Sequence, residues 1–98
     1  MRIRWTEKAR ADLEEAYSYI AEDRPAAARN LVENIRSAVA DLAELPQIGR
    51  IIPEIGDPTL RERLVRPYRI FYLVRGEEVV ILGVHHSRRE LPEDLGNA

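Results

Sequence analysis

The chain has 98 residues, of which 45% are hydrophobic and 33% charged, a balance that is ordinary for a globular domain. We predict a single domain over residues 1–98 with one apolar core. The absence of cysteine excludes disulfides, thiol chemistry and sulfur-ligated zinc. No apolar run approaches the roughly 18 residues of a membrane span, and the start of the chain lacks the apolar stretch of a secretory signal. We expect a cytoplasmic protein with no membrane partner.

The N-terminal part predicts a short strand followed by a helix. Residues 2–5 alternate polar and apolar side chains, which favours an edge strand. Thr6 is suited to cap a helix, and Glu7 places a carboxylate at the positive end of the helix dipole. Apolar residues then recur at helical spacing, so we expect an amphipathic helix over residues 7–22.

A second helix is predicted after a very short break. Pro25 is well placed at the first position of a helix, because an N–H there would have no partner within the helix. An apolar stripe at helical spacing continues to residue 45, and Pro46 ends it. Because so few residues join the two predicted helices, we expect them to form an antiparallel hairpin.

The C-terminal half predicts a long loop and then three strands. Residues 46–58 contain three prolines and two glycines, and a loop of this length inside a compact domain is often functional. Pro67 separates the first two strands, since proline cannot donate to a strand ladder. The predicted strands cover residues 60–66, 68–75 and 78–86.

A two-residue turn at Gly76-Glu77 sets the pairing of the last two strands. This register places Arg75 opposite Glu78, Phe71 opposite Leu82 and Tyr68 opposite His85. Both faces of the predicted sheet are then apolar at their centre, whereas an antiparallel sheet with one wet side is apolar on one face only. The helices can cover one face, so the second must meet either the chain's own tail or a partner protein.

Together these elements predict an α+β fold. It consists of a short N-terminal strand and an antiparallel helical hairpin packed on an antiparallel β-meander, in the order β-α-α-β-β-β. We expect residues 90–98 to form a loosely ordered tail.

Residues 61–89 concentrate positive charge in the predicted strands. Seven arginines against three glutamates give this segment a charge of +4 with neutral histidines, while the whole chain carries −2. Such a concentration indicates an anionic partner, either nucleic acid or an acidic protein segment. A pI near 5.7 argues against a DNA-coating protein. His85 and His86 are adjacent on a strand and point to opposite faces, His85 to the face of Tyr68 and His86 to the face of Phe71, so we expect no metal site. We also expect no cofactor.

Four motifs, in order along the chain, resemble the RelE/ParE superfamily of toxins from type II toxin–antitoxin systems. They are WTEKARADL at residues 5–13, PQIGR at 46–50 with Pro53-Glu54, YRIFY at 68–72, and VVILGVHH at 79–86 leading into Ser87-Arg88-Arg89. Each motif alone is weak, but the ordered set spans nearly the whole chain. The resemblance implies a growth-inhibiting toxin, of the kind associated with plasmid stabilisation, that a cognate antitoxin protein neutralises.

The superfamily divides into ribosome-dependent mRNA endonucleases, the RelE type, and inhibitors of DNA gyrase, the ParE type. A metal-free nuclease needs a base, an acid and cations that hold the scissile phosphate. In a nuclease, this chain would draw those groups from Arg69, His85, His86 and Glu54. However, its only lysine is Lys8, no tyrosine follows Tyr72, and arginine stays protonated and cannot act as a base.

We therefore favour the ParE-like branch, in which the toxin traps DNA gyrase and needs neither catalytic residues nor a small-molecule substrate. The alternative is the nuclease, whose partner would be the ribosome with its mRNA. The arginines expected to contact the target or its phosphates are Arg61, Arg63, Arg66, Arg69, Arg88 and Arg89. The residues expected to contact the antitoxin, on the sheet face that the helices leave uncovered, are Phe71, Leu73, Val80, Leu82 and Val84. A groove on the helices is a second place for the antitoxin.

Overall fold

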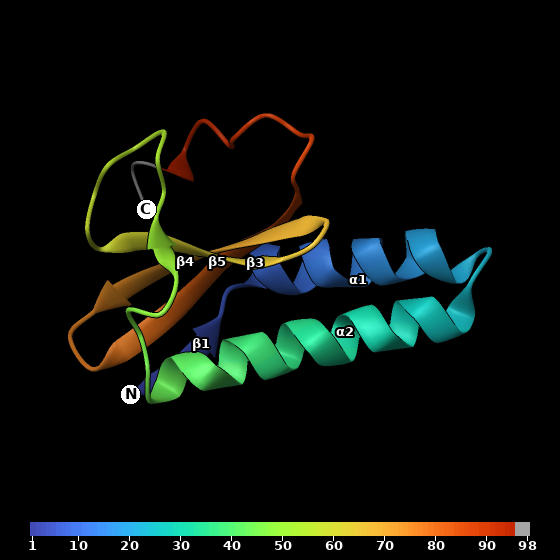
Figure 1. Ribbon diagram of the computed structural model, residues 1–98, viewed down its shortest axis with the longest axis horizontal. Helices are drawn as coiled ribbons and strands as arrows, with labels where there is room; N and C mark the ends of the chain where they lie inside the picture. Colours follow the sequence, from blue (N-terminus) through green and yellow to red (C-terminus); the bar gives the residue numbers. More distant parts are fainter. Residues whose placement is uncertain (96–98) are drawn as a thin grey trace.

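The computed structural model describes residues 1–95 and has an α+β architecture, with two helices packed on one face of a five-stranded sheet (Figure 1). The last three residues of the predicted tail, 96–98, lie outside the described residues. The elements are β1 (Arg2–Trp5), α1 (Glu7–Ala21), α2 (Pro25–Ala40), a 3₁₀ turn (Asp41–Ala43), β2 (Arg50–Ile51), β3 (Leu60–Val65), β4 (Tyr68–Arg75) and β5 (Glu78–His86). The predicted fold class and element order are confirmed, apart from the two-residue β2, which falls within the predicted loop.

The sheet is mixed, with the strand order β1-β5-β4-β3-β2. Strands β2 to β5 pair antiparallel, and β1 lies at the edge and runs parallel to β5. The predicted edge strand is therefore present, but it extends the meander in parallel. The predicted hairpin turn is also confirmed, because Arg75 pairs with Glu78 and Gly76 adopts a positive φ of 60° that glycine tolerates.

Local capping explains where the helices begin and end. The Thr6 hydroxyl accepts the Ala9 N–H at 3.1 Å and donates to the Ile81 carbonyl at 2.8 Å, so one side chain caps α1 and ties it to β5. Helix α2 ends at Ala40, several residues before the predicted end. The chain then continues as a 3₁₀ turn over Asp41–Ala43, a common ending of α-helices, before it reaches Pro46.

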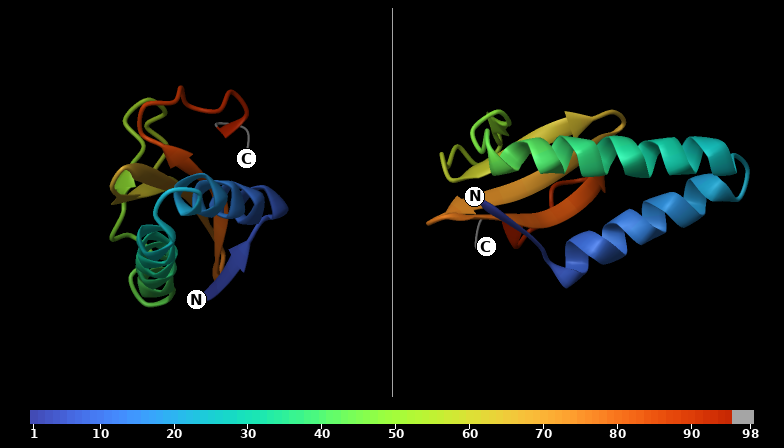
Figure 2. Two further views of the ribbon diagram at one scale, coloured as in Figure 1. Left: turned by 90° about the vertical axis from the view of Figure 1, so that its right-hand side faces the viewer. Right: turned by 90° about the horizontal axis from the view of Figure 1, so that it is seen from below.

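The main core lies between the helical hairpin and the sheet. Figure 2 shows both helices on the same side of the strands. Fully buried apolar side chains fill this layer. Burial of each of the larger ones stabilises the fold by roughly 1.5–3 kcal/mol. Those with the least exposure are Ala9, Ile35, Leu42, Ile70, Tyr72, Val79 and Ile81.

A β-bulge in β5 changes which side chains face the helices. Tyr72 pairs with Ile81 but its neighbour Phe71 pairs with Gly83, so Leu82 is the extra residue. The predicted pairing of Phe71 with Leu82 is therefore wrong, and so is that of Tyr68 with His85. Beyond the bulge every side chain of β5 is turned to the face opposite the predicted one.

The side chain of Asp12 on α1 stabilises the bulge. Its carboxylate accepts the Val84 N–H at 3.0 Å and pairs with Lys8 at 3.1 Å. Glycine suits position 83, since a Cβ there would lie 3.1 Å from that carboxylate. As a result Val84 is 4% exposed and packs in the helix-facing core.

The opposite face of the sheet, which we call the outer face, is covered by the chain itself. Figure 1 shows the loop after α2 and the C-terminal segment on the side of the sheet away from the helices. Ile52 of the loop and Leu95 of the tail join a second apolar cluster with Phe71, Leu73 and Val80. Of the two alternatives for this face, the structure therefore shows the chain's own segments. Within the expected loose tail, Leu95 is only 5% exposed, so this residue packs on the sheet.

The side chain of Tyr72 in β4 holds the start of the loop after α2 through two hydrogen bonds. Its hydroxyl donates to the Pro46 carbonyl at 2.7 Å and accepts the Gly49 N–H at 3.0 Å. A Cβ at position 49 would lie 2.5 Å from the carbonyl oxygen of Glu62, so only glycine fits this approach. Among residues 1–95, neither helix has the length and apolar character needed to cross a membrane.

Candidate functional site

Two of the arginines expected to contact a target instead hold the chain's own backbone and carboxylates. Arg61 donates to the carbonyls of Pro58 at 3.1 Å and Gly49 at 3.0 Å. Arg63 pairs with Asp41, after helix α2, at 3.0 Å. These two side chains therefore brace the loop and the end of the hairpin.

Arg69 is the most strongly engaged of these arginines. Its Nε donates to Glu62, whose side chain is fully buried, and its two terminal nitrogens donate to Glu54 at 3.0 and 3.1 Å. The guanidinium also lies 5.1 Å from the centre of the Phe71 ring. The hydrogen bond with Glu54 raises the pKa of Arg69, and the same bond lowers the pKa of Glu54. Arg50 completes the network by pairing with Glu62.

The two histidines lie on opposite faces of the sheet, but the bulge reverses the face expected for each. His85 lies on the outer face, 6.0 Å from the Phe71 ring, and burial lowers its pKa, followed by the charge of Lys8. His86 lies on the helix face, where its ring and that of Tyr68 are edge-to-face with their centres 5.4 Å apart. Its Nδ1 accepts the N–H of Arg88 at 3.1 Å.

The structure therefore brings together only part of the nuclease set. Arg69, Glu54 and His85 share the outer face, and Arg69 of β4 lies opposite His85 of β5 in the strand register. His86 is on the other side of the sheet. The guanidinium of Arg69, which would hold a phosphate in a nuclease, is already bound by the carboxylates of Glu54 and Glu62.

Three of the six predicted contact arginines remain available, and they lie at one end of the sheet. We call Arg66, Arg88 and Arg89 the basic end. Ser87 holds the segment together, because its N–H and hydroxyl both donate to the Pro67 carbonyl, at 2.8 and 2.7 Å. Within residues 1–95, the side chains of Arg66 and Arg88 have no hydrogen-bond or ion-pair partner. Arg89 lies 3.7 Å from Glu15, and both side chains are more than 60% exposed.

The surface expected to bind an antitoxin is not open. Phe71, Leu73 and Val80 are 7% exposed or less beneath the loop and tail, and Leu82 packs against the same cluster. Val84 faces the helices because of the bulge. In this structure the chain's own segments occupy the face, so antitoxin contact through these five residues stays a prediction that would require the loop and tail to move.

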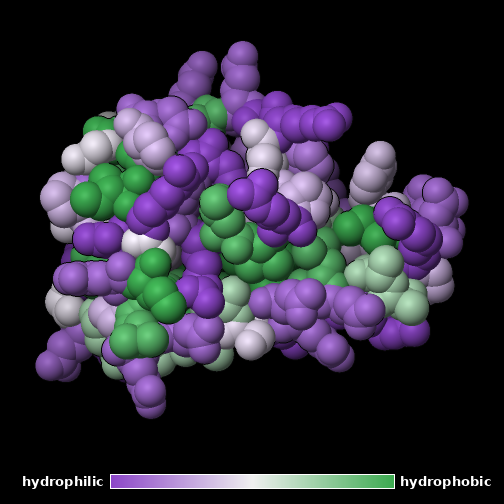
Figure 3. All heavy atoms as spheres, in the orientation of Figure 1, coloured by the Kyte–Doolittle hydropathy of each residue, from purple (hydrophilic) through white to green (hydrophobic). Residues whose placement is uncertain are grey.

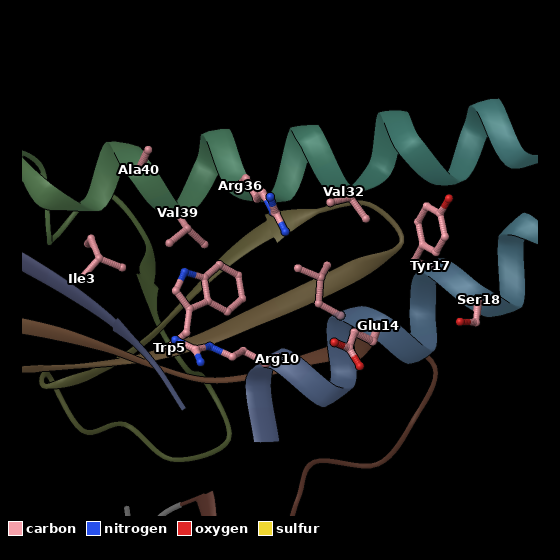
Figure 4. Close-up of a pocket in the computed structure, with 11 residues that line it drawn as sticks. Ile3, Trp5, Arg10, Glu14, Tyr17, Ser18, Val32, Arg36, Val39 and Ala40 are labelled. Atoms are coloured by element: carbon pink, nitrogen blue, oxygen red, sulfur yellow. The ribbon is translucent and has the colours of Figure 1, made fainter. Parts of the chain in front are cut away.

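An apolar groove lies instead between α1, α2 and β1, with a volume of about 860 Å³. Figure 3 shows hydrophobic residues lining a hollow across the middle of this face. In Figure 4, the Trp5 ring and the side chains of Tyr17, Val32 and Val39 point into the space between the two helices. Arg10, Glu14 and Arg36 are charged residues that also line it. Tyr17 fits the sequence pattern of a core residue, yet it is 37% exposed.

No group of three or more histidine, aspartate or glutamate side chains within residues 1–95 is arranged to hold a metal ion.

Comparisons with known proteins identify the relatives of this fold. The sequence matches the family model of the ParE toxin of type II toxin–antitoxin systems, parDE, over residues 3–91. It is 38% identical over 97 residues to the putative toxin Y4kP of Sinorhizobium fredii, covering 96% of each chain. It is 37% identical over 86 residues to toxin RelE2 of Caulobacter vibrioides, covering 87% of this chain and 93% of the relative. A solved chain from the chromosomal ParDE system of P. aeruginosa shares 28% identity with a TM-score of 0.74, covering 88% of this chain and 95% of that one.

The fold and these matches define the class as a toxin of type II toxin–antitoxin systems, within the RelE/ParE superfamily. Within that class the chain belongs to the ParE toxin family, whose model matches nearly its whole length.

Proposed function

We propose that this toxin stops growth by trapping DNA gyrase and not by cutting mRNA on the ribosome. The observation that carries the proposal is the state of Arg69. A nuclease needs that cation free to hold the scissile phosphate, but here Glu62 and Glu54 bind it from two sides. Its side chain is 11% exposed, so an incoming phosphate would first have to displace both carboxylates.

The remaining candidate groups do not compensate for this. Glu54 is held ionised by Arg69, and His85 and His86 are separated by the sheet. General acid–base catalysis requires both groups within hydrogen-bond reach of one substrate. A gyrase-trapping toxin requires only a stable surface, and membership of the ParE toxin family favours that mode of action.

An antitoxin is the second partner in this proposal, and we place it in the groove between the helices. The solved relative comes from a ParDE toxin–antitoxin system. The groove is lined mainly by apolar side chains and carries Arg10 and Arg36 against a single acidic residue, Glu14. An amphipathic helix with acidic flanks has the chemistry that fits such a groove.

Two assays run in parallel test the choice of target. Purified toxin is added to gyrase with plasmid DNA, and separately to ribosomes programmed with mRNA. We expect loss of supercoiling and accumulation of cleaved plasmid, with intact mRNA. Toxin premixed with the antitoxin is the control and should leave both reactions unchanged. Cut mRNA together with undisturbed supercoiling would overturn the gyrase proposal and favour the nuclease.

A further inference from the structure

Helix α1 separates two hollows of different character. The apolar groove lies along one side, where Arg10, Leu13 and Tyr17 contribute to its wall. On the opposite side a second hollow of about 410 Å³ lies between α1 and the ends of β4 and β5. It is lined by Asp12, Glu15, Ala16, Tyr19, Tyr68, Val84, His86 and Arg89.

The second hollow is continuous with the basic end, because Arg89 belongs to both. The hydrogen bonds of Ser87 to the Pro67 carbonyl hold Arg66 and Arg88 beside it. Tyr19 at its rim is 78% exposed, more than any other large apolar or aromatic residue described. Tyrosine and arginine are the residue types that most often dominate the binding energy of protein interfaces.

The electrostatic balance of this surface is positive. Arg66 and Arg88 have no acidic partner within the described part of the chain, and the contact of Arg89 with Glu15 is long and exposed, so it is weak. The carboxylate of Asp12 is already satisfied by Lys8 and the Val84 N–H. Three guanidinium groups therefore face solvent against two carboxylates, that of Glu15 in the hollow and that of Glu90, which follows Arg89 in the chain and is exposed.

We propose that the basic end, together with Tyr19 and the second hollow, is the surface that contacts the toxin's target. The target presents an acidic protein segment to the arginines and an apolar or aromatic side chain to the hollow. The chain's net charge of −2 and the carboxylate of Glu15 in the hollow favour a protein partner over nucleic acid, whose binding domains are strongly basic. The identity of that protein as gyrase rests on the proposed function.

Charge reversal tests the surface. Arg66→Glu/Arg88→Glu is compared with Arg75→Glu, a single reversal at another exposed arginine without an ion-pair partner among residues 1–95, which is the last residue of β4 and lies at the strand end away from Arg66. All three proteins are immobilised and probed with purified gyrase without DNA. We expect the double reversal to weaken binding by about tenfold or more and Arg75→Glu by less than about twofold. Raising the salt concentration from about 50 to 200 mM should weaken the binding of gyrase to the wild-type toxin. Circular dichroism and thermal melting confirm that the variants fold.

Three results would overturn the surface assignment. Equal weakening by Arg75→Glu would show only a general effect of charge. Full gyrase binding by the double reversal would place the contact elsewhere. Wild-type binding to a labelled oligonucleotide alone, lost in the double reversal, would make the partner nucleic acid.

Growth arrest in cells separates this inference from the proposed function. If wild-type toxin fails to bind gyrase, the proposed target is wrong, but the surface can still be judged. In that case expression of the double reversal should be harmless while Arg75→Glu still arrests growth. Growth arrest by both variants would overturn the surface as well.

Discussion

At the scale of single residues, the central feature is a carboxylate buried between two arginines. Glu62 has a fully buried side chain and is bound by Arg50 and Arg69. A buried charge is stable only while its partners remain, and removing one partner costs far more than a surface ion pair is worth. In the sequence, Arg69 had the attributes of a catalytic residue. In the fold its neighbours are Glu62 of β3 and Glu54 of the loop, and these contacts give Arg69 a structural role. They depend on strand pairing and loop packing, which the sequence around Arg69 does not reveal.

Arg69→Ala should therefore destabilise the protein. It would leave Glu62 buried with Arg50 alone, and breaking a buried pair typically costs about 3–5 kcal/mol. We expect roughly 3 kcal/mol, the lower end of that range, because Arg50 remains. Urea unfolding measures the loss. Arg66→Ala, at an exposed arginine without an ion-pair partner among residues 1–95, should change stability by less than about 0.5 kcal/mol. If Arg69→Ala instead kept wild-type stability and abolished toxicity, Arg69 would have a direct functional role.

At the scale of elements, local patterns predict where helices and strands lie but not how one strand pairs with another. The first helix and the last three strands begin and end within a residue or two of their predicted bounds, because capping, periodicity and proline act locally. The bulge at Leu82 depends instead on Asp12, 72 residues before Val84 in the chain. No periodicity in the strand itself carries that information, so His85 and His86 were assigned to the wrong faces.

The groove is also a property of paired elements, and α1 offers a matched test of it. Tyr17 lines the groove, whereas Tyr19, two residues later, lines the hollow on the other side of the helix. Tyr17→Ala should weaken antitoxin binding by about 2 kcal/mol, the threshold of an interface hot spot and roughly thirtyfold in affinity. Titration calorimetry with the purified antitoxin measures this. Tyr19→Ala should bind the antitoxin as wild type does, and equal losses in the two variants would mean that the antitoxin does not select the groove.

At the scale of the whole molecule, the chain forms three layers, with helices, sheet and a cover of loop and tail. In the sequence the C-terminal segment from residue 90 has the character of a solvated tail, because Leu91 and Leu95 stand among charged residues. Their contribution to packing depends on Phe71, Leu73 and Val80, which form the apolar face that the two leucines cover. The sequence showed that this face needed a cover, yet could not decide between the tail and a partner.

The cover can be tested by weakening the tail without shortening it. In Leu91→Ala/Leu95→Ala the apolar side chains over the outer face are trimmed, and large-to-small changes at buried leucines cost about 2–5 kcal/mol each. Because Leu91 is only partly buried, we expect a total loss of roughly 3 kcal/mol. The variant should also bind a hydrophobic dye that wild type ignores. Leu45→Ala, at a leucine that is 56% exposed, is the control and should do neither. Unchanged stability and no dye binding in the double variant would mean that the tail leaves the sheet in solution, and the outer face would then be open to a partner after all.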